Sequence, residues 1–366
     1  MKLHIHSLIL ASIVLFNGCR DEETHFSGTI ASFLPQVELA SIQADTLEFS
    51  GAYTPLFAVY DSLLFLCNIQ KGSYIFDVYN IDTKSLIGHF FHRGHGHDEY
   101  TVLTSIYGFF KENNKLKTLL TAPNEQKLLI WDITESIKQG RTIDEMEIPY
   151  KWQRNSPIPA SRQILLSNDR ILTYTPSCRF SDEKEPTLPL YEIRNIPDYE
   201  KTNEIMVFTK NFKERRNQRM TPDCFFWTSL CLKPDKSKFV EVMFWLPQIN
   251  IVDIQSKEIK GYRMKGGADF SIFEQSMDAA TNYYQRVQAN NDYIFALWAE
   301  TDWRTIKGNT SFNILHVFDW NGRLLKKIRL ETPIQEMFLD TERNILYGCQ
   351  EDAEQLFCYH TSDMIF

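Results

Sequence analysis

The chain has 366 residues, of which 39 are Lys or Arg and 47 are Asp or Glu, so its formal net charge is −8 at pH 7. It contains no run of basic residues, and nucleic-acid binding requires clustered positive charge, so no nucleic-acid partner is expected. The length corresponds to about two average domains or to one large all-β domain.

Residues 1–18 have the organisation of a signal peptide. Lys2 supplies a positive charge, and the apolar stretch from Leu8 to Phe16 is too short to span a bilayer, which needs about 20 residues. The segment Leu15-Phe16-Asn17-Gly18-Cys19 resembles a bacterial lipobox. That resemblance implies a diacylglyceryl group on Cys19 and cleavage just before it. An ordinary secretory signal with an incidental cysteine is the alternative.

Acidic residues follow directly, and Arg20-Asp21-Glu22-Glu23 resembles the export signal that sends Bacteroidetes lipoproteins to the cell surface. A solvated linker is the alternative interpretation. We therefore predict that residues 19–35 are a lipidated tether of an outer-membrane lipoprotein, on its periplasmic or cell-surface side. A lipid anchor holds a soluble domain at a membrane, so the membrane would be contacted only through that anchor.

The remaining cysteines are Cys67, Cys178, Cys224, Cys231, Cys349 and Cys358. An even number of cysteines permits disulfides in an exported protein. The sequence contains no CxxC pair, so a zinc knuckle is not expected. Cys67, Cys349 and Cys358 lie in apolar strand patterns, where a free thiol behaves as a small hydrophobic residue. The sequence leaves their pairing open.

A short pattern recurs along the chain, in which two or three apolar residues end in a polar residue, and a turn usually follows; Val78–Asn80 is its first copy. The polar members lie 52, 60, 61, 66 and 41 positions apart; they are Asn80, Asp132, Glu192, Asp253, Asp319 and His360. A strand-rich unit that recurs about every 40 to 66 residues is typical of the blades of a β-propeller.

Strand patterns separated by turn residues divide the chain after residue 50 into six units. They run from Leu56 to His92, Ser105 to Pro149, Arg162 to Thr209, Cys224 to Met264, Tyr283 to Leu330 and Ile334 to His360. The last unit has only three strand patterns, whereas residues 36–50 hold a strand pattern without a hairpin partner. Because a closed ring leaves few exposed strand edges, we predict that an N-terminal strand completes the sixth blade.

The predicted fold class is therefore all-β: a six-bladed β-propeller over residues 36–366 with four-stranded antiparallel blades. A brief helical pattern at 271–279 is the one exception in the chain.

The link after the first unit carries a glycine-rich motif, Arg93-Gly94-His95-Gly96-His97-Asp98-Glu99-Tyr100. It resembles the Gly-Arg-Gly-Pro-Gly-Glu-Tyr/Phe element of the TolB-like six-bladed propeller lipoproteins of Bacteroidetes. Gly94, Gly96, Glu99 and Tyr100 match that element, and His95, His97 and Asp98 depart from it. With the lipobox and the six units, the resemblance covers the whole mature chain and implies a periplasmic or surface propeller, usually without an assigned activity.

The same motif suggests a metal hypothesis, because imidazole and carboxylate are zinc ligands. Only His95 and His97, with Asp98, could converge there, since His89 and His92 would point to opposite faces of a strand. The glycines more simply indicate a tight turn between blades. We therefore predict a structural turn and no cofactor.

The sequence holds no nucleophile elbow, zinc-protease motif, phosphate-binding loop or calcium loop. Propeller hydrolases and lyases take their carboxylates from different blades, which sequence spacing does not reveal. An extracytoplasmic glycan or peptide hydrolase or lyase acting at the channel mouth is therefore the alternative function. A carboxylate cluster at the mouth would favour that alternative, and an aromatic lining would favour binding.

Long links alternate with short turns, which predicts that the long links emerge on one face of the disc, where binding usually occurs. These links, 93–104, 150–161, 176–187, 210–223 and 300–311 among them, carry the candidate anchors Trp152, Arg154, Arg179, Arg215, Arg216, Arg219, Trp303 and Arg304. Solvated loops are the alternative. We expect a binding or interaction module for an unidentified envelope protein, peptide or glycan, with a structural subunit of an envelope complex as a further alternative.

Overall fold

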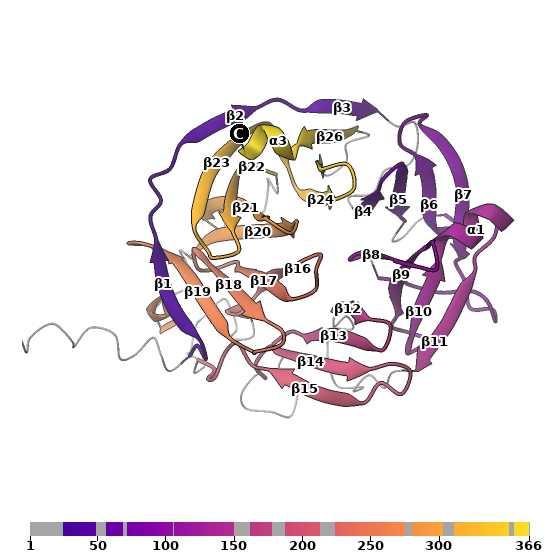
Figure 1. The fold of residues 1–366 in the computed structure, drawn as a ribbon, viewed down its shortest axis with the longest axis horizontal. Helices are drawn as coiled ribbons and strands as arrows, with labels where there is room; N and C mark the ends of the chain where they lie inside the picture. The colour runs from indigo at the N-terminus through magenta and orange to yellow at the C-terminus, as the bar shows by residue number, and fades with distance from the viewer. Residues whose placement is uncertain are drawn as a thin grey trace, which may run out of the picture.

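The computed structural model describes residues 25–48, 56–68, 72–104, 106–149, 162–177, 187–212, 224–274, 280–302, 311–350 and 355–365. These residues form six β-sheets arranged around a central axis (Figure 1). Each sheet contains four antiparallel strands, and the innermost strand of the sixth sheet contacts that of the first, so the ring is closed. The predicted six-bladed β-propeller is confirmed.

Blades one to three are each built from one continuous stretch of chain. Blade one contains β4 (Phe57–Tyr60), β5 (Leu63–Cys67), β6 (Tyr74–Asn80) and β7 (Ser85–His92). Blade two contains β8 (Phe109–Glu112), β9 (Lys115–Ala122), β10 (Lys127–Asp132) and β11 (Asp144–Pro149). Blade three contains β12 (Arg162–Ser167), β13 (Arg170–Thr175), β14 (Leu190–Asn195) and β15 (Lys201–Ile205).

Blades four to six follow the same plan from the axis outward. Blade four contains β16 (Thr228–Leu232), β17 (Lys238–Met243), β18 (Gln248–Asp253) and β19 (Ile259–Met264). Blade five contains β20 (Thr281–Ala289), β21 (Tyr293–Asp302), β22 (Phe312–Asp319) and β23 (Leu324–Ile334). Blade six contains β24 (Glu336–Asp340), β25 (Ile345–Cys349) and β26 (Gln355–His360) from the same stretch.

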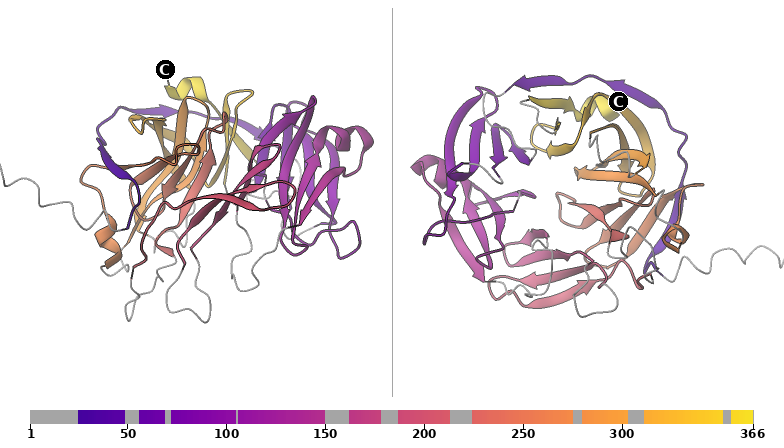
Figure 2. Two further views of the ribbon diagram at one scale, coloured as in Figure 1. Left: turned by 60° about the horizontal axis from the view of Figure 1, so that its bottom comes forward. Right: turned by 180° about the vertical axis from the view of Figure 1, so that it is seen from behind.

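The missing strand of blade six comes from the N-terminal belt, which we define as residues 29–48. Its strands are β1 (Thr29–Phe33), β2 (Leu39–Ile42) and β3 (Asp45–Glu48), which follow the rim of blades four, five and six (Figures 1 and 2). β3 pairs antiparallel with β26 and completes blade six, as predicted. β1 and β2 pair in parallel with β19 and β23 and add a fifth strand to blades four and five. β1 lies in the segment that the sequence analysis placed in the tether.

Three of the six recurring polar residues, Asn80, Asp253 and Asp319, close turns at the ends of third strands. Asn80 Oδ1 accepts hydrogen bonds from the N–H groups of the two turn residues Asp82 and Thr83, at 3.0 and 2.9 Å. Asp253 and Asp319 accept backbone N–H groups in the same way, at distances between 2.9 and 3.1 Å. A short polar side chain that mimics a backbone turn explains why the pattern ends in Asn or Asp.

The core consists of apolar clusters between neighbouring blades. Trp131 of blade two, for example, lies among Phe65, Phe76, Phe90 and Phe91 of blade one, with ring centroids 5.2 to 5.7 Å apart. Its indole N–H, which burial would otherwise leave unpaired, donates to Ser136 Oγ at 2.9 Å. Large aromatic side chains packed in this way fix each blade against the next.

Among the described residues, three short helical segments accompany the strands. α1 (Ile133–Gln139) follows β10, with Asp132 as its N-cap and Gly140 ending it in the left-handed conformation. A 3₁₀ helix, η3 (Phe270–Glu274), overlaps the predicted helical pattern, and α3 (Thr361–Ile365) follows β26. No helix among the described residues is both long and apolar enough to cross a membrane.

Candidate functional site

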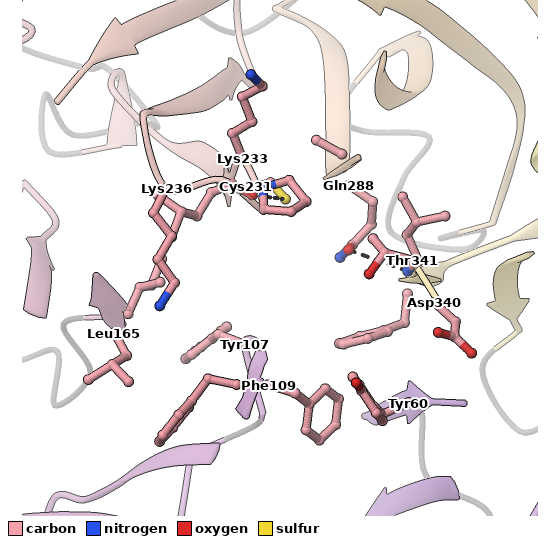
Figure 3. A pocket seen from close by; sticks show the side chains of 18 of the residues that line it. Tyr60, Tyr107, Phe109, Leu165, Cys231, Lys233, Lys236, Gln288, Asp340 and Thr341 are labelled. Carbon is pink, nitrogen blue, oxygen red and sulfur yellow. Dashed lines mark hydrogen bonds between the residues drawn. The ribbon is translucent and has the colours of Figure 1, made fainter. Parts of the chain in front are cut away.

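The described residues form a pocket of about 160 Å³ on the propeller axis, to which all six blades contribute (Figure 3). Its lining comes from the innermost strands β4, β8, β12, β16, β20 and β24, from residues next to the ends of these strands, and from Leu119 of β9. We call this the central pocket. Its lining residues are spread from Val59 to Thr341, so no local sequence pattern marks it.

The central pocket lies toward one end of the channel. Each innermost strand leads into the turn that joins it to the second strand, and we call the end bearing these turns the turn face. In four blades the pocket is lined by the last residues of β4, β16, β20 and β24, and by Lys233, Pro234, Lys236 and Thr341 from the turns that follow. In blades two and three it is lined by 107–110, around the start of β8, and by 163–165, in the first part of β12. The predicted contact face, which bears the links between blades, is the opposite end.

Aromatic rings form one side of the central pocket (Figure 3). The rings of Tyr60 and Phe109 lie 5.3 Å apart, and those of Phe109 and Phe338 lie 6.1 Å apart, so blades one, two and six meet through them. Lys111 Nζ lies 5.4 Å from the centre of the Tyr60 ring, and the Arg162 guanidinium lies 5.5 Å from that of Tyr107. The rings therefore present flat apolar surface, and two of them have a cation close by.

Two lysines of the β16–β17 turn line the central pocket, and they differ in whether a carboxylate is paired with them. Lys233 Nζ lies 2.5 Å from Asp235 Oδ2 and 5.7 Å from the centre of the Trp320 ring. Lys236 is half-buried and forms no ion pair with any described residue. Burial lowers the pKa of Lys236, because desolvation disfavours the charged ammonium.

The one carboxylate in the described lining, that of Asp340, serves its own turn. Asp340 is 1% exposed, and its Oδ1 accepts a hydrogen bond from Glu342 N at 3.0 Å. Burial raises the pKa of this carboxyl group, and its Oδ2 has no hydrogen-bond partner. Gln288 next to it joins blade five to blade six, donating to Met337 O at 3.3 Å and accepting from Leu339 N at 3.4 Å.

The thiol of Cys231 also lines the central pocket. Burial raises its pKa to about 12, so it stays protonated and is a poor nucleophile. Cys67, Cys224, Cys231, Cys349 and Cys358 are all free thiols, and Cys178 lies outside the described residues.

The glycine-rich motif is a compact turn between blades one and two. Gly96 N donates to Glu99 Oε2 at 2.8 Å, and a Cβ atom at Gly94 would collide with the Glu99 carboxylate, whereas one at Gly96 would contact it tightly. Arg93 donates from Nη1 to Thr101 O at 3.1 Å and thereby ties the two ends of the turn together. Glycine is needed here for close approach of the Glu99 side chain.

The remaining residues of the motif fall into a buried anchor and an exposed tip. Tyr100 is buried and donates from its hydroxyl to Asp144 Oδ2, 3.3 Å away in blade two. His95 is exposed, and the side chains of His97 and Asp98 are 98% and 95% exposed. In the described part of the chain, no group of three or more His, Cys, Asp or Glu side chains is placed to hold a metal ion.

The other predicted site residues lie outside the described residues. These are the lipidation residue Cys19 and the candidate anchors Trp152, Arg154, Arg179, Arg215, Arg216, Arg219, Trp303 and Arg304. Contact through the long links therefore stays a prediction.

No protein-family model matches the sequence, and no curated protein matches it. Among solved structures, this fold is similar to that of a DUF4221 family member from Bacteroides vulgatus, with a TM-score of 0.54, 14% identity, and coverage of 86% of this chain and 96% of that chain. A protein of Bacteroides fragilis described as a candidate exported protein gives a TM-score of 0.48, with 12% identity and coverage of 87% and 88%. At such identities the likeness concerns the propeller fold alone.

Proposed function

We propose that this chain is an exported, lipid-anchored binding module that takes a small organic ligand in its central pocket. Its predicted place is the outer membrane, held through Cys19, and the predicted ligand sources are envelope proteins, peptides or glycans. The pocket favours a short peptide end or a single sugar-sized group over a large surface, because it is a concavity of about 160 Å³ on the axis.

The observation that carries this proposal is the aromatic lining contributed by several blades. Ligand sites are typically concave and mostly apolar, with a few polar groups that fix orientation. The rings of Tyr60, Tyr107 and Phe109 supply the apolar surface, and Lys236 and Gln288 supply polar groups. Tyr60, Phe109 and Gln288 lie on strands, and Lys236 lies in a turn closed by its own backbone hydrogen bond, so little ordering would accompany binding.

The hydrolase or lyase alternative has less support. Glycoside hydrolysis needs two carboxyl groups, about 5 to 9.5 Å apart, and the described lining offers only the carboxylate of Asp340. One oxygen of that group is bound to its own turn, and the described lining supplies no second carboxyl group. The aromatic lining therefore favours binding, by the criterion set in the sequence analysis.

A variant that fills the central pocket tests the proposal. Gly108 lines the pocket, and a Cβ atom there meets no atom within 4 Å, so Gly108→Trp should fold normally and occupy the space. The matched control is Leu86→Trp, at a 45% exposed position on β7. We expect ligand-observed NMR to detect phenylacetamide and phenylacetate binding to the wild type and Leu86→Trp, and not to Gly108→Trp. Absence of binding, or binding that survives Gly108→Trp, would reject the pocket as the site.

The anchor is tested separately. A Cys19→Ala variant expressed in the native host should lose its partitioning into the detergent phase. A variant that stays in that phase would show that the protein is not anchored through Cys19.

A further inference from the structure

We infer that the ligand of the central pocket carries a carboxylate, and that the Lys236 ammonium binds it. This inference deepens the proposed function and rests on it. It assigns the ligand to one chemical class: small organic carboxylates with a flat apolar body.

The turn geometry holds Lys236 at the pocket. Lys236 N donates to Lys233 O at 2.8 Å and closes the turn, and Lys233 N donates to Lys238 O at 2.9 Å at its base. Lys236 itself has a left-handed backbone (φ 62°). Figure 3 shows its side chain extending into the pocket toward the side where Leu165 lies, whereas Lys233 leads away from it.

The contrast between these lysines indicates which one is available to a ligand. The charge of Lys233 is already balanced by Asp235 at 2.5 Å. The ammonium of Lys236 is partly desolvated and has no carboxylate partner among the described residues. A charge withdrawn from water without a partner is unfavourable, and an incoming anion would supply that partner.

The surroundings of Lys236 define the rest of the ligand. Apolar and aromatic residues, including Tyr107, Phe109 and Leu165, face the same space, so a flat apolar body would lie against them. The Asp340 carboxylate is the only anion in the described lining, and its Oδ1 is bound to its own turn. An organic carboxylate therefore complements the pocket better than a neutral or cationic molecule of the same shape.

The test compares phenylacetate with phenylacetamide, which has nearly the same shape without the charge, by titration calorimetry or NMR. Because charge-assisted hydrogen bonds are strong, we expect the wild type to bind phenylacetate about tenfold more tightly than phenylacetamide. Lys236→Met should abolish this preference without weakening phenylacetamide binding, and Lys236→Arg should retain most of it. The matched control Lys233→Met, in the same turn, should keep the full preference.

The outcomes separate this inference from the proposed function. Equal binding of both probes to the wild type, or a preference that survives Lys236→Met, would overturn the role of Lys236. If Gly108→Trp still blocked both probes, the central pocket would remain the site. If neither probe bound, or Gly108→Trp had no effect, the proposed function itself would be rejected.

Discussion

Blades one to three and blades four to six protect their outer edges in different ways. In blades four and five, β1 and β2 pair with the outermost strands, and in blade six β3 is itself the outermost strand. The outermost strands of blades one to three, β7, β11 and β15, pair with no further strand in the described part of the chain. An unpaired strand edge is a template for association with another chain.

The open half, blades one to three, protects these edges with charge and irregular pairing. β11 carries three acidic residues and ends in a proline, and β15 carries the exposed ion pair of Lys201 and Glu204 at 3.0 Å. Both strands shift register against their inner neighbours. In β7, the Phe91 N–H donates to Thr142 Oγ1 at 2.7 Å. Each of these devices discourages pairing with a foreign strand.

In the belted half, blades four to six, the outer strands need less protection of their own because the belt covers their edges. β23 has 11 residues, against 8, 6 and 5 for β7, β11 and β15. A long uncovered edge strand is an association hazard, so β23 is tolerable because β2 lies against it. The belt therefore covers edges as well as closing the ring.

Buried ionisable groups are accommodated in two ways in this propeller. In blade two, the buried Asp132 is paired with Lys115 at 2.8 Å, and the buried Lys117 with Glu112 at 2.7 Å. In blade four, burial raises the pKa of Glu241 to about 7, and in blade five it lowers the pKa of His316 to about 3. Blade two neutralises buried charge by pairing, as Arg286 and Glu336 also do between blades five and six, whereas burial favours the uncharged forms of Glu241 and His316.

The largest effect should come from removing the belt. A chain that lacks residues 24–50 loses β1, β2 and β3, the buried Phe26 and Phe33, and the outermost strand of blade six. We expect its melting temperature to fall by on the order of 10 °C or more. Differential scanning calorimetry measures this, and a peptide of residues 25–48 added in trans should restore part of the loss. A melting temperature equal to that of the parent would show that the belt is dispensable.

An intermediate effect should appear as a pH dependence centred on Glu241. Its carboxylate accepts hydrogen bonds from the Tyr191 hydroxyl and from Asn250 Nδ2, the latter at 2.7 Å. Because the folded pKa of about 7 lies above the ordinary value of 4.5, the stabilisation is complete below about pH 4.5 and is lost as the pH rises through 7. Glu241→Gln is neutral at every pH and should lack this loss.

Urea unfolding at pH 5 and pH 8 measures the difference. Relative to Glu241→Gln, the wild type should lose roughly 2 to 3 kcal/mol of unfolding free energy between these pH values. The exposed Glu204→Gln serves as the control and should follow the wild type. Parallel wild-type and Glu241→Gln profiles would show that Glu241 does not titrate in this range.

The smallest effect should come from replacing surface ion pairs on the outer strands. The Lys201–Glu204 pair on the open β15 and the Glu258–Lys260 pair beside the covered β19 have N–O distances of 3.0 and 2.9 Å. Changing each pair to two isoleucines should alter stability little. Only the change on β15 should promote self-association, which analytical ultracentrifugation would detect. Association of the β19 variant to the same extent would remove the distinction between the halves.

Much of the fold was predictable because each blade is built from local signals. The pattern ending in Asn80, Asp253 or Asp319 reflects turn capping that involves the next few residues only. β3 was predictable for a different reason, since a closed ring requires a partner for β26. Helix α1 was not predicted, although Asp132 and Glu135 show a capping signal, with Glu135 N donating to Asp132 Oδ1 at 2.8 Å.

The rest could not be predicted because it depends on distant pairings. β1 and β2 pair in parallel with strands more than 200 residues away in sequence, as the Thr29–Lys260 and Leu39–Lys327 partners show, so no hairpin signal marks them. The central pocket likewise combines residues from six blades. Lys236 belongs to no motif in the sequence, and its partial burial depends on the closure of the ring.

The pairing of β3 with β26 has a consequence for biosynthesis. Gln355 and Glu48, which face each other in this pair, are separated by 307 positions. A ribosome makes residues 45–48 long before residues 355–360, so β3 has no partner in its blade while most of the protein is being made. Joining segments so far apart carries a large chain-entropy cost, and topologies dominated by distant pairings fold slowly. During that interval the growing chain would expose unpaired strands to proteases and to other chains, and a chaperone that shields them would raise the yield of closed rings.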